Sequence, residues 1–539
     1  MTALDWAILA IYIVGIIGMS WAIGRRQKSQ NDYYLGGRAM PAWQIALSIM
    51  ATQVSAISLI GAPAFIALRA NGGLVWLQYE FAIPLAMMLI MLILVPMYHR
   101  AHGVTIYEYL ERRFGAATRS TISAVFLISR GLGSGVALLA TGIVTAVCLN
   151  WPLWETVLLI GVVSIVYTTF GGIKADIYSD IIQLVILWTG AFISLFILWN
   201  KLDGRAFSVL TQDSSRFRVF NFSASGLGDG QTFAFWPMLI GGFFLYLSYY
   251  GCDQSQAQRL LTTRTFHQAQ KALFLNGLLR FPLVLTYCAV GVLLLPFLHT
   301  HPEFAGQLDG RPPDFLIPYF LIQYIPKGLL GILIAGIFAA SMSTLDSALN
   351  SLSAATYRDF LVKIRPGLDA LSNRKQVRLS RLLTIFWGII STAFALKMIG
   401  GSETVLELVN KIGSAFYGPV LAVFWLGMWV RRASEKGAIT GLAAGVAVNI
   451  FLWQYFGERV SWLWWNVVGF GVSFGFGLAS CLISSVRPGE ATLPYLLTRK
   501  DLRTFLGRKK YYIWLFLFFL AILLLSKGIE FFLRNRAGI

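Results

Sequence analysis

The sequence predicts an all-α polytopic membrane protein with about fourteen transmembrane helices. Three observations predict this class: 57% of the 539 residues are hydrophobic, only 13% are charged, and apolar stretches of about 20 residues recur along the chain. A soluble protein has about 25% charged residues, so the composition excludes a cytosolic globular enzyme and a disordered chain. The predicted spans are residues 4–23, 42–68, 74–98, 120–148, 152–172, 177–199, 232–252, 273–298, 328–357, 382–400, 406–430, 437–456, 461–485 and 511–533.

The first apolar stretch, residues 4–23, is interpreted as a true span. It is too long and too uniformly apolar for the core of a signal peptide, and it has no small-residue cleavage site. We therefore expect it to remain as the first membrane helix.

Basic residues gather in alternate loops. Of the 44 Lys and Arg residues, 29 lie in loops 24–41, 99–119, 173–176, 253–272, 358–381, 431–436 and 486–510. The positive-inside rule places these loops in the cytoplasm and both chain ends outside, in a plasma (inner) membrane. The net charge of +19 is therefore an orientation signal, and we expect no nucleic-acid partner.

Known catalytic and metal-binding patterns are missing from the sequence. The four cysteines, Cys148, Cys252, Cys288 and Cys481, have no metal-binding or redox spacing. There is no Walker A motif, no HExxH motif and no nucleophile elbow. These absences argue against a primary pump and against an intramembrane enzyme.

Two spans contain residues that interrupt a helix. The second span has a Thr52-Gln53-x-Ser55 cluster at its midpoint and Gly61-x-Pro63 about two turns later, and the seventh begins at Trp236-Pro237 and continues to Gly241-Gly242. Unwound backbone is tolerated at membrane depth only where it is buried in protein or lines a cavity. The alternative is a proline kink with close packing through glycine.

The two interrupted spans lie five spans apart, so they have opposite orientations. Spans two to six and seven to eleven then form two inverted repeats, and the broken helices mark the expected binding site of a transporter. The predicted organisation is an N-terminal helix and loop (1–41), a first repeat (42–200), an external loop (201–231), a second repeat (232–430) and C-terminal helices (431–539).

Polar side chains in the ninth span point to a cation. Ser343, Asp346 and Ser347 share one helical face, with Thr344 beside them. Hydroxyls in membrane helices commonly bond to neighbouring helices or to their own backbone. An ionised carboxylate at mid-span costs about 2.5–3.5 kcal/mol, so Asp346 needs a cation, a proton or an arginine partner.

The sixth span has a second acidic face. Asp176, Asp180 and Gln183 lie on it, with Asp176 near the membrane boundary and Asp180 one turn deeper. We expect Asp176 to be an interfacial cap and Asp180 to take part in ion binding. Oxygen donors without a soft-metal ligand suit a hard monovalent cation.

Arg130 is an arginine within the fourth span, in glycine-rich surroundings. Its side chain could extend toward the headgroups, as long basic side chains do near helix ends. The surrounding glycines favour a cavity wall instead, where a guanidinium could bind a carboxylate through two hydrogen bonds.

Four motifs together resemble the sodium/solute symporter family, and the similarity extends from the first span to about the thirteenth. They are Ala51-x-x-Val54-Ser55-Ala56 with Gly61-x-Pro63; Phe170-Gly171-Gly172 leading to Ser179-Asp180-x-x-Gln183; Asp253-Gln254 with Gln258-Arg259; and Met342-Ser343-Thr344 leading to Arg358-Asp359. The resemblance implies the inverted-repeat fold of the leucine-type transporters and sodium as the coupling ion.

The resemblance also implies positions for sodium. Ala51, Val54 and Ala340 would supply backbone carbonyls, and Ser343 and Thr344 would supply hydroxyls. Some members bind a second sodium ion at positions that match Asp180, Ser343, Asp346 and Ser347. Those members have serine where this chain has Asp346, which could strengthen the second site or, if protonated, block it.

The substrate positions implied are Gln53, Ser55, Ser58, Gln78 and Arg130. Arg130 matches a carboxylate-binding arginine of sialic acid transporters, whereas no clear match is found to the glutamate that sugar-transporting members have in helix three. We therefore expect import of a carboxylate-bearing sugar acid such as sialic acid. The alternatives are a neutral sugar, another monocarboxylate or amino acid, or proton coupling. We expect a monomer whose partners are the small solute and the lipid bilayer.

Overall fold

The computed structural model describes residues 1–53, 56–203, 215–399, 405–483 and 490–536. These ranges are almost entirely helical; their only β-structure is an isolated bridge between Leu227 and Val460. In these ranges eleven helices are long and apolar enough to cross a membrane, or up to twelve when the bent pair α3 and α4 counts as one span. The predicted all-α membrane class is confirmed.

The main helices of the described ranges follow one another along the chain, and the longest connection runs from 202 to 236. Their bounds are α1 (Ala3–Gly24), α2 (Gln30–Leu35), α3 (Ala42–Gln53), α4 (Ala56–Ala67), η2 (Leu74–Phe81), α5 (Ala82–Leu89), η3 (Ile90–Leu94), α6 (Val95–Ala101), α7 (Tyr107–Arg113), α8 (Ala116–Leu149), α9 (Leu153–Lys201), η5 (Pro237–Gly241), α11 (Gly242–Cys252), α12 (Gln254–Leu261), α13 (Phe266–Thr300), α14 (Pro302–Ala305), α15 (Leu316–Tyr324), α16 (Leu329–Ala355), η8 (Thr356–Leu361), α17 (Val362–Ile364), α18 (Asn373–Lys397), α19 (Val405–Trp429), α20 (Glu435–Phe456), α21 (Trp462–Ile483), α22 (Arg499–Phe505) and α23 (Lys509–Arg536).

The described ranges contain eleven or twelve helices long enough to cross a membrane, fewer than the fourteen spans that the sequence predicts. Two segments account for the difference. The spans expected at 152–172 and 177–199 form the single element α9, in which two helices meet at Gly172. The span expected at 232–252 is a short helix, Gly242–Cys252, preceded by the π-helical turn Pro237–Gly241. Gly172 has φ +55°, and a Cβ there would lie 2.6 Å from the Tyr33 carbonyl oxygen, so only glycine fits this turn.

The predicted interruption of the second span is present. Ala42–Gln53 and Ser58–Ala67 are bent by 53° relative to each other. The bend precedes Gly61-x-Pro63, and α4 continues through Pro63. The break therefore lies at the polar cluster of the span and not at its proline.

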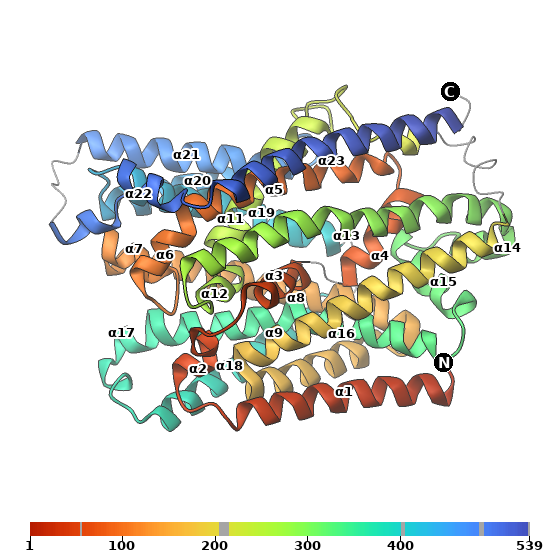
Figure 1. The fold of residues 1–539 in the computed structure, drawn as a ribbon, viewed down its shortest axis with the longest axis horizontal. Helices are drawn as coiled ribbons and strands as arrows, with labels where there is room; N and C mark the ends of the chain where they lie inside the picture. Colours follow the sequence, from red (N-terminus) through yellow and green to blue (C-terminus); the bar gives the residue numbers. More distant parts are fainter. Residues whose placement is uncertain (54–55, 204–214, 400–404, 484–489, 537–539) are drawn as a thin grey trace.

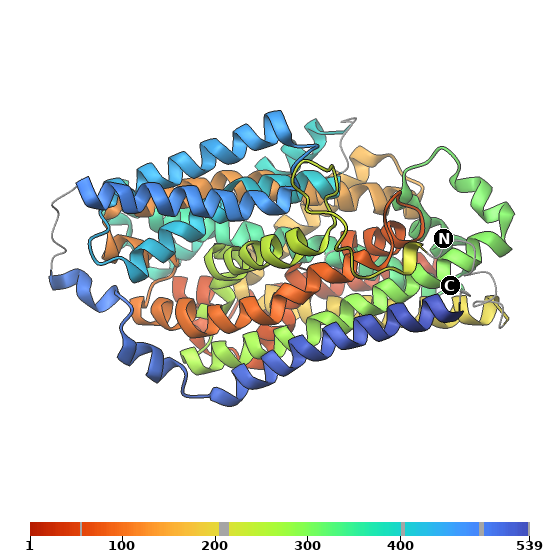
Figure 2. The same ribbon diagram turned by 90° about the horizontal axis from the view of Figure 1, so that it is seen from above.

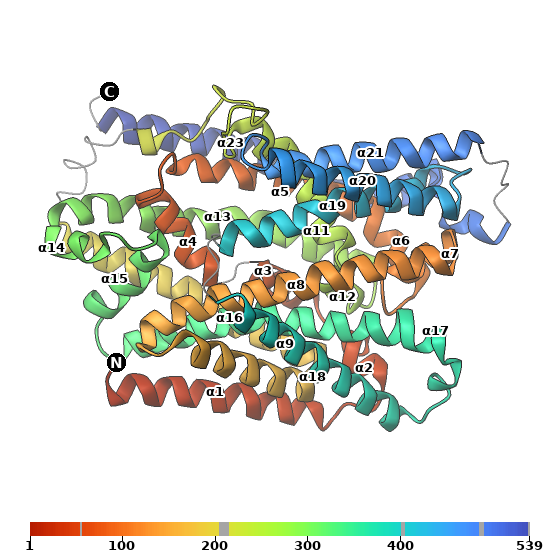
Figure 3. The same ribbon diagram turned by 180° about the vertical axis from the view of Figure 1, so that it is seen from behind.

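The two broken-span halves lie inside the bundle. Helix α3 packs against α13, α9 and α16, and α16 also packs against α8 and α1. Figure 1 shows α3 between α13 and α9, and Figure 3, from the opposite side, shows α8 in front of it. The polar residues of α3 and α16 are therefore placed next to each other at the centre of the protein.

The two ends of the bundle differ in what they contain. The N-terminus and the end of α23 lie at one end, and α7, α17 and α22, which belong to the basic loops, lie at the other (Figures 1 and 2). Large apolar side chains on the outer helices are exposed, such as Ile11 (72%) in α1 and Leu524 (75%) in α23. An apolar outer surface of this extent is expected of a multi-pass membrane protein.

Candidate functional site

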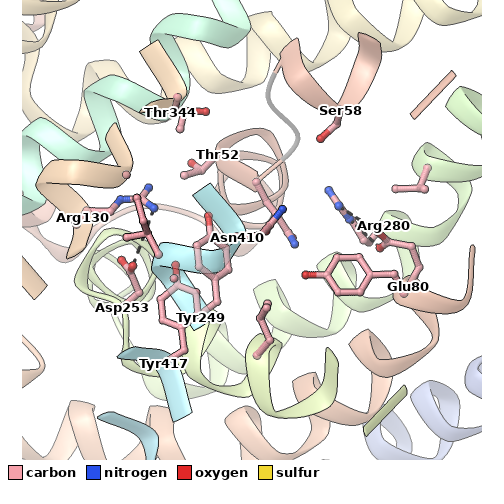
Figure 4. Close-up of a pocket in the computed structure, with 18 of the residues that line it drawn as sticks. Thr52, Ser58, Glu80, Arg130, Tyr249, Asp253, Arg280, Thr344, Asn410 and Tyr417 are labelled. Atoms are coloured by element: carbon pink, nitrogen blue, oxygen red, sulfur yellow. Dashed lines mark hydrogen bonds and ion pairs between the residues drawn. The ribbon is translucent and has the colours of Figure 1, made fainter. Parts of the chain in front are cut away.

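A cavity of about 170 Å³ lies beside the break between α3 and α4. Its walls come from α3, α4, η2, α8, α11, α13, α16 and α19. The polar and aromatic residues that line it are Thr52, Gln53, Ser58, Trp76, Tyr79, Glu80, Ser129, Arg130, Ser134, Tyr249, Asp253, Arg280, Tyr287, Thr344, Asn410 and Tyr417. Figure 4 shows Arg130 with Asp253 on one side of the cavity, Arg280 with Glu80 on the other, and Asn410 between them.

Arg130 reaches this cavity from α8. Its side chain is only 12% exposed, and its Nη1 lies 4.0 Å from Oδ2 of Asp253. Its Nε and Nη2 atoms are buried and have no hydrogen-bond partner among the described residues. The guanidinium is therefore enclosed and does not extend to the headgroups. Buried N–H donors without acceptors are costly, and a carboxylate is the group that satisfies them best.

The opposite side of the cavity holds a second ion pair. Nε of Arg280 in α13 donates to Oε2 of Glu80 at 3.0 Å, and Nη2 donates to Oε1 at 3.3 Å. The Arg280 side chain is 6% exposed and that of Glu80 1%. The third guanidinium nitrogen of Arg280, Nη1, has no hydrogen-bond partner among the described residues. This pair can therefore donate a hydrogen bond through Arg280 and accept one through Glu80.

Three of the predicted substrate residues line the cavity and one, Gln78, does not. Gln53, Ser58 and Arg130 line the cavity, whereas Ser55 lies outside the described residues. Gln78 is fully buried away from the cavity wall: its Nε2 donates to the Val75 carbonyl at 3.1 Å, and its Oε1 accepts from the Asn221 amide at 3.1 Å. Gln78 thus connects η2 to the segment around Asn221.

The residues that sequence reasoning missed are Glu80, Arg280, Asp253, Tyr249 and Tyr417. Glu80 and Arg280 stand out in hindsight, because each is a charged residue inside an apolar span. A glutamate in the third span that faces the cavity is therefore present, at Glu80. Asp253 was expected in a cytoplasmic loop, but it ends α11 and is only 6% exposed.

Among the described residues, the predicted sodium ligands Ala51, Ala340, Ser343 and Thr344 belong to α3 and α16, which pack against each other. Ala51 in α3 and Ala340 and Ser343 in α16 are at most 2% exposed. Oγ1 of Thr344 is buried without a hydrogen-bond partner among the described residues, and Thr344 also lines the cavity. An unpaired buried oxygen fits a sodium ligand. Val54 lies outside the described residues.

A buried polar cluster lies behind this position. The predicted second sodium set, Asp180, Ser343, Asp346 and Ser347, is at most 1% exposed and is brought together. Ser343 donates to Asp180, and both Tyr167 and Ser347 donate to Asp346. Nη2 of Arg259, from α12, lies 3.0 Å from Oδ2 of Asp180.

Asp176 is not the interfacial cap that the sequence predicts. It is fully buried, and neither of its carboxyl oxygens has a hydrogen-bond partner among the described residues. Helix α2 packs against α9, and the Tyr33 carbonyl oxygen lies close to Gly172, four residues before Asp176.

Helices that cross a membrane, one of them broken beside an enclosed charged cavity, define a secondary transporter. The profile of the sodium:solute symporter family matches residues 33–445. The chain belongs to the sodium:solute symporter family. It is thus a sodium-coupled solute transporter and not an enzyme, as the sequence predicted.

Two curated relatives and one solved structure show the range of similarity. The chain is 30% identical over 460 residues to the sodium-coupled monocarboxylate transporter 2 of Danio rerio, a match that covers 83% of this chain and 71% of the relative. It is 28% identical over 474 residues to the sodium/sialic acid symporter NanT of Aliivibrio fischeri, covering 86% and 90%. The outward-open structure of a sodium-coupled sialic acid symporter superposes with a TM-score of 0.82 at 23% identity over 91% of this chain and 99% of that one, which shows a shared fold.

Proposed function

We propose that the protein imports a carboxylate-bearing sugar acid, such as a sialic acid, together with sodium by alternating access. The observation that carries the substrate class is Arg130, a buried guanidinium with two N–H-bearing nitrogens that find no acceptor among the described residues. A solute carboxylate would satisfy both. The named substrates of the two relatives above, monocarboxylates and sialic acid, all bear a carboxylate, which supports the proposal.

The far side of the cavity supports a solute with hydroxyl groups. Glu80 accepts hydrogen bonds and the free Nη1 of Arg280 donates one, and a hydroxyl group can do both. Aromatic side chains between the two ends, including Tyr249 and Tyr417, offer apolar faces to a sugar ring. A sugar acid uses both ends, whereas a small monocarboxylate uses only Arg130.

Sodium would bind between the broken span and α16. Its ligands in this proposal are the carbonyls of Ala51, Val54 and Ala340 and the hydroxyls of Ser343 and Thr344. A cation there joins α3 to α16 and fixes the cavity wall at Thr344; separation of the two helices releases it together with the solute. Each charge that moves down 100 mV supplies about 2.3 kcal/mol.

The proposed architecture is a five-plus-five inverted repeat, residues 42–200 and 232–430, within fourteen spans. The bent pair α3 and α4 and the π-helical turn before α11 stand at the expected starts of the two repeats. The N-terminal segment (1–41), the external loop (201–231) and the C-terminal helices (431–539) surround the repeats. In this proposal both termini are extracytoplasmic in the plasma membrane and one chain works alone.

A neutral sugar is a second candidate, and the charges of the cavity favour it. Asp253 lies 4.0 Å from Arg130, and Glu80 pairs with Arg280, so the four charges cancel. Arg130 is then already balanced in part and needs no anionic solute. Uptake of glucose or galactose that survives Arg130→Ala would select this candidate.

Uptake of radioactive sialic acid into proteoliposomes tests the proposal. We expect uptake with a sodium gradient and none when choline replaces sodium; uptake that follows a pH gradient instead would select proton coupling. Arg130→Ala should abolish uptake of the acid. Arg113→Gln is the matched control, because Arg113 is buried but bonds backbone carbonyls of Gly427 and Val430 outside the cavity. Sialic acid uptake retained by Arg130→Ala would refute the carboxylate role.

A further inference from the structure

The guanidinium of Arg259 lies among the oxygens at which a second sodium ion would be expected. Nη2 donates to Oδ2 of Asp180 at 3.0 Å and also to Oγ of Ser347, two of the four side chains of that set. A third, Ser343, donates to the other oxygen of Asp180. Sodium ligands at Asp180 are therefore already engaged by protein groups.

The remaining donors of Arg259 hold the guanidinium in place. Nε donates to Oγ of Ser48 in α3 at 2.7 Å, and Nη1 donates to the Ser255 carbonyl at 2.7 Å. The side chain is 0% exposed, like that of Asp180. One guanidinium thus connects α12 to α3, α9 and α16, and its planar fork leaves no room for small rearrangements without loss of several hydrogen bonds.

Because Asp180 is buried, its charge can be balanced either by the Arg259 guanidinium or by a sodium ion. Asp180 has no access to water, so its charge needs a partner of opposite sign in its immediate surroundings. An arginine is charged at every physiological pH, so it provides that partner permanently. A sodium ion bound beside it would repel the guanidinium at short range with little solvent to screen the repulsion.

We propose that Arg259 is a tethered cation that takes the place of a second sodium ion at Asp180, Ser343 and Ser347, and that the protein binds one sodium ion per chain. This inference rests on the proposed sodium site at Thr344. Asp346 accepts no hydrogen bond from Arg259; its hydrogen bonds within the described residues come from Tyr167 and Ser347. The coupling is then fixed at one sodium ion per solute by a side chain of the protein.

Equilibrium binding of radioactive sodium to the purified full-length protein, without any solute, tests the inference. We expect one sodium ion per chain for the native protein and loss of that ion in Thr344→Ala. Arg259→Gln frees Asp180 and should raise the count to two. A native count of two overturns the inference and leaves sodium coupling intact, whereas a count of zero overturns the proposed sodium site and the inference with it.

Two further variants separate the charge effect from misfolding. Arg259→Gln combined with Asp180→Asn removes both charges of the pair, so it should fold and bind one ion. Arg113→Gln, which removes a buried guanidinium that bonds the backbone carbonyls of Gly427 and Val430, should also bind one. If Arg259→Gln folds and still binds one ion, the guanidinium does not exclude sodium and the inference is wrong. If it does not fold, the native count decides: one ion supports the inference and two ions overturn it.

Discussion

Two buried arginine sites in this protein are built in opposite ways. At the end of the bundle that contains the basic loops, Nε of Arg119 donates to Oδ1 of Asp359 at 2.7 Å, and the same carboxylate accepts from Thr105 and Ser123 at 2.8 Å each. In the cavity, Arg130 has two nitrogens with no partner among the described residues, and Arg280 has one.

The difference distinguishes an arginine that stabilises the fold from an arginine that is available to bind a solute. A buried network in which every group is satisfied holds helices together, here α8 and η8, and its parts cannot be removed singly. Buried N–H donors without acceptors add little to the free energy of unfolding. They form hydrogen bonds only when a solute is bound. Loss of stability upon substitution should therefore fall from the first site to the second.

Asp359→Ala should have the largest effect on stability. It leaves Nε of Arg119 and the hydroxyls of Thr105 and Ser123 without their buried acceptor, at a cost of about 1–3 kcal/mol for each group left unsatisfied, while Arg119 keeps its pair with Glu111. Thermal unfolding of the purified protein measures it. Asp369→Ala is the matched control, because Asp369 is 49% exposed and pairs with Arg358 at the surface, where a pair contributes at most about 1 kcal/mol. Equal melting temperatures for the two variants would contradict the structural role of Asp359.

Glu80→Gln should have an intermediate effect. The amide keeps an acceptor for Arg280 but removes the charge, which costs about 1–3 kcal/mol for a buried hydrogen-bonded group. The same thermal measurement applies, with the exposed Glu458→Gln as control. Because Glu80 faces the cavity, apparent affinity for a hydroxylated solute should also fall, while that for a small monocarboxylate should not. Equal losses for both solutes would speak against the proposed two-ended cavity.

Arg130→Ala should lower stability by only about 1 kcal/mol, because the ion pair that it removes, with Asp253 at 4.0 Å, is longer than a hydrogen bond. Its Nε and Nη2 have no hydrogen bonds to lose, and Asp253 keeps its bonds to the Ser255 amide at 2.8 Å and hydroxyl at 2.6 Å. The melting temperature should stay near that of the native protein, while the rise in melting temperature caused by the solute should disappear. A fall as large as that of Asp359→Ala would make Arg130 structural.

Asp346→Ser should have the smallest effect, within about 1 kcal/mol, because loss of a buried charge offsets loss of the hydrogen bonds from Tyr167 and Ser347. Sodium binding should remain at one ion per chain. Thermal unfolding and sodium binding on one preparation check both expectations. A sodium count that changes would mean that Asp346 itself is an ion ligand.

The fold class and the charged residues inside apolar spans are predictable from the sequence, because both depend on local composition. Apolar runs of sufficient length can only be membrane helices, and an arginine or aspartate inside such a run, such as Arg130 or Asp180, is conspicuous because it is expensive there. The polar cluster of the second span likewise marks the bend between α3 and α4. These features need no knowledge of which helices meet.

Pairings between distant residues could not be predicted. Glu80 and Arg280 are 200 residues apart, and the two partners are joined only once α13 lies against η2. Gln78, the position that the resemblance implies in this span, is buried away from the cavity, whereas Glu80 two residues later lines it. Leu74–Phe81 is a 3₁₀ helix with three residues per turn, so α-helical spacing does not predict which of its residues face the cavity. Asp176 was misplaced for a similar reason: its burial is a property of the tertiary fold.

The tight turn at Gly172 sets the position of Asp180 relative to the first of the two helices of α9. The two helices of α9 meet there without an intervening loop, and the Tyr33 carbonyl closes the remaining space. Asp180 follows eight residues later on a continuous helix, so nothing between them can absorb a change in length. One inserted residue would turn Asp180 by about 100° and point its carboxylate away from Arg259. Insertions and deletions between Gly172 and Asp180 should therefore be tolerated far less than in the connections between other helices.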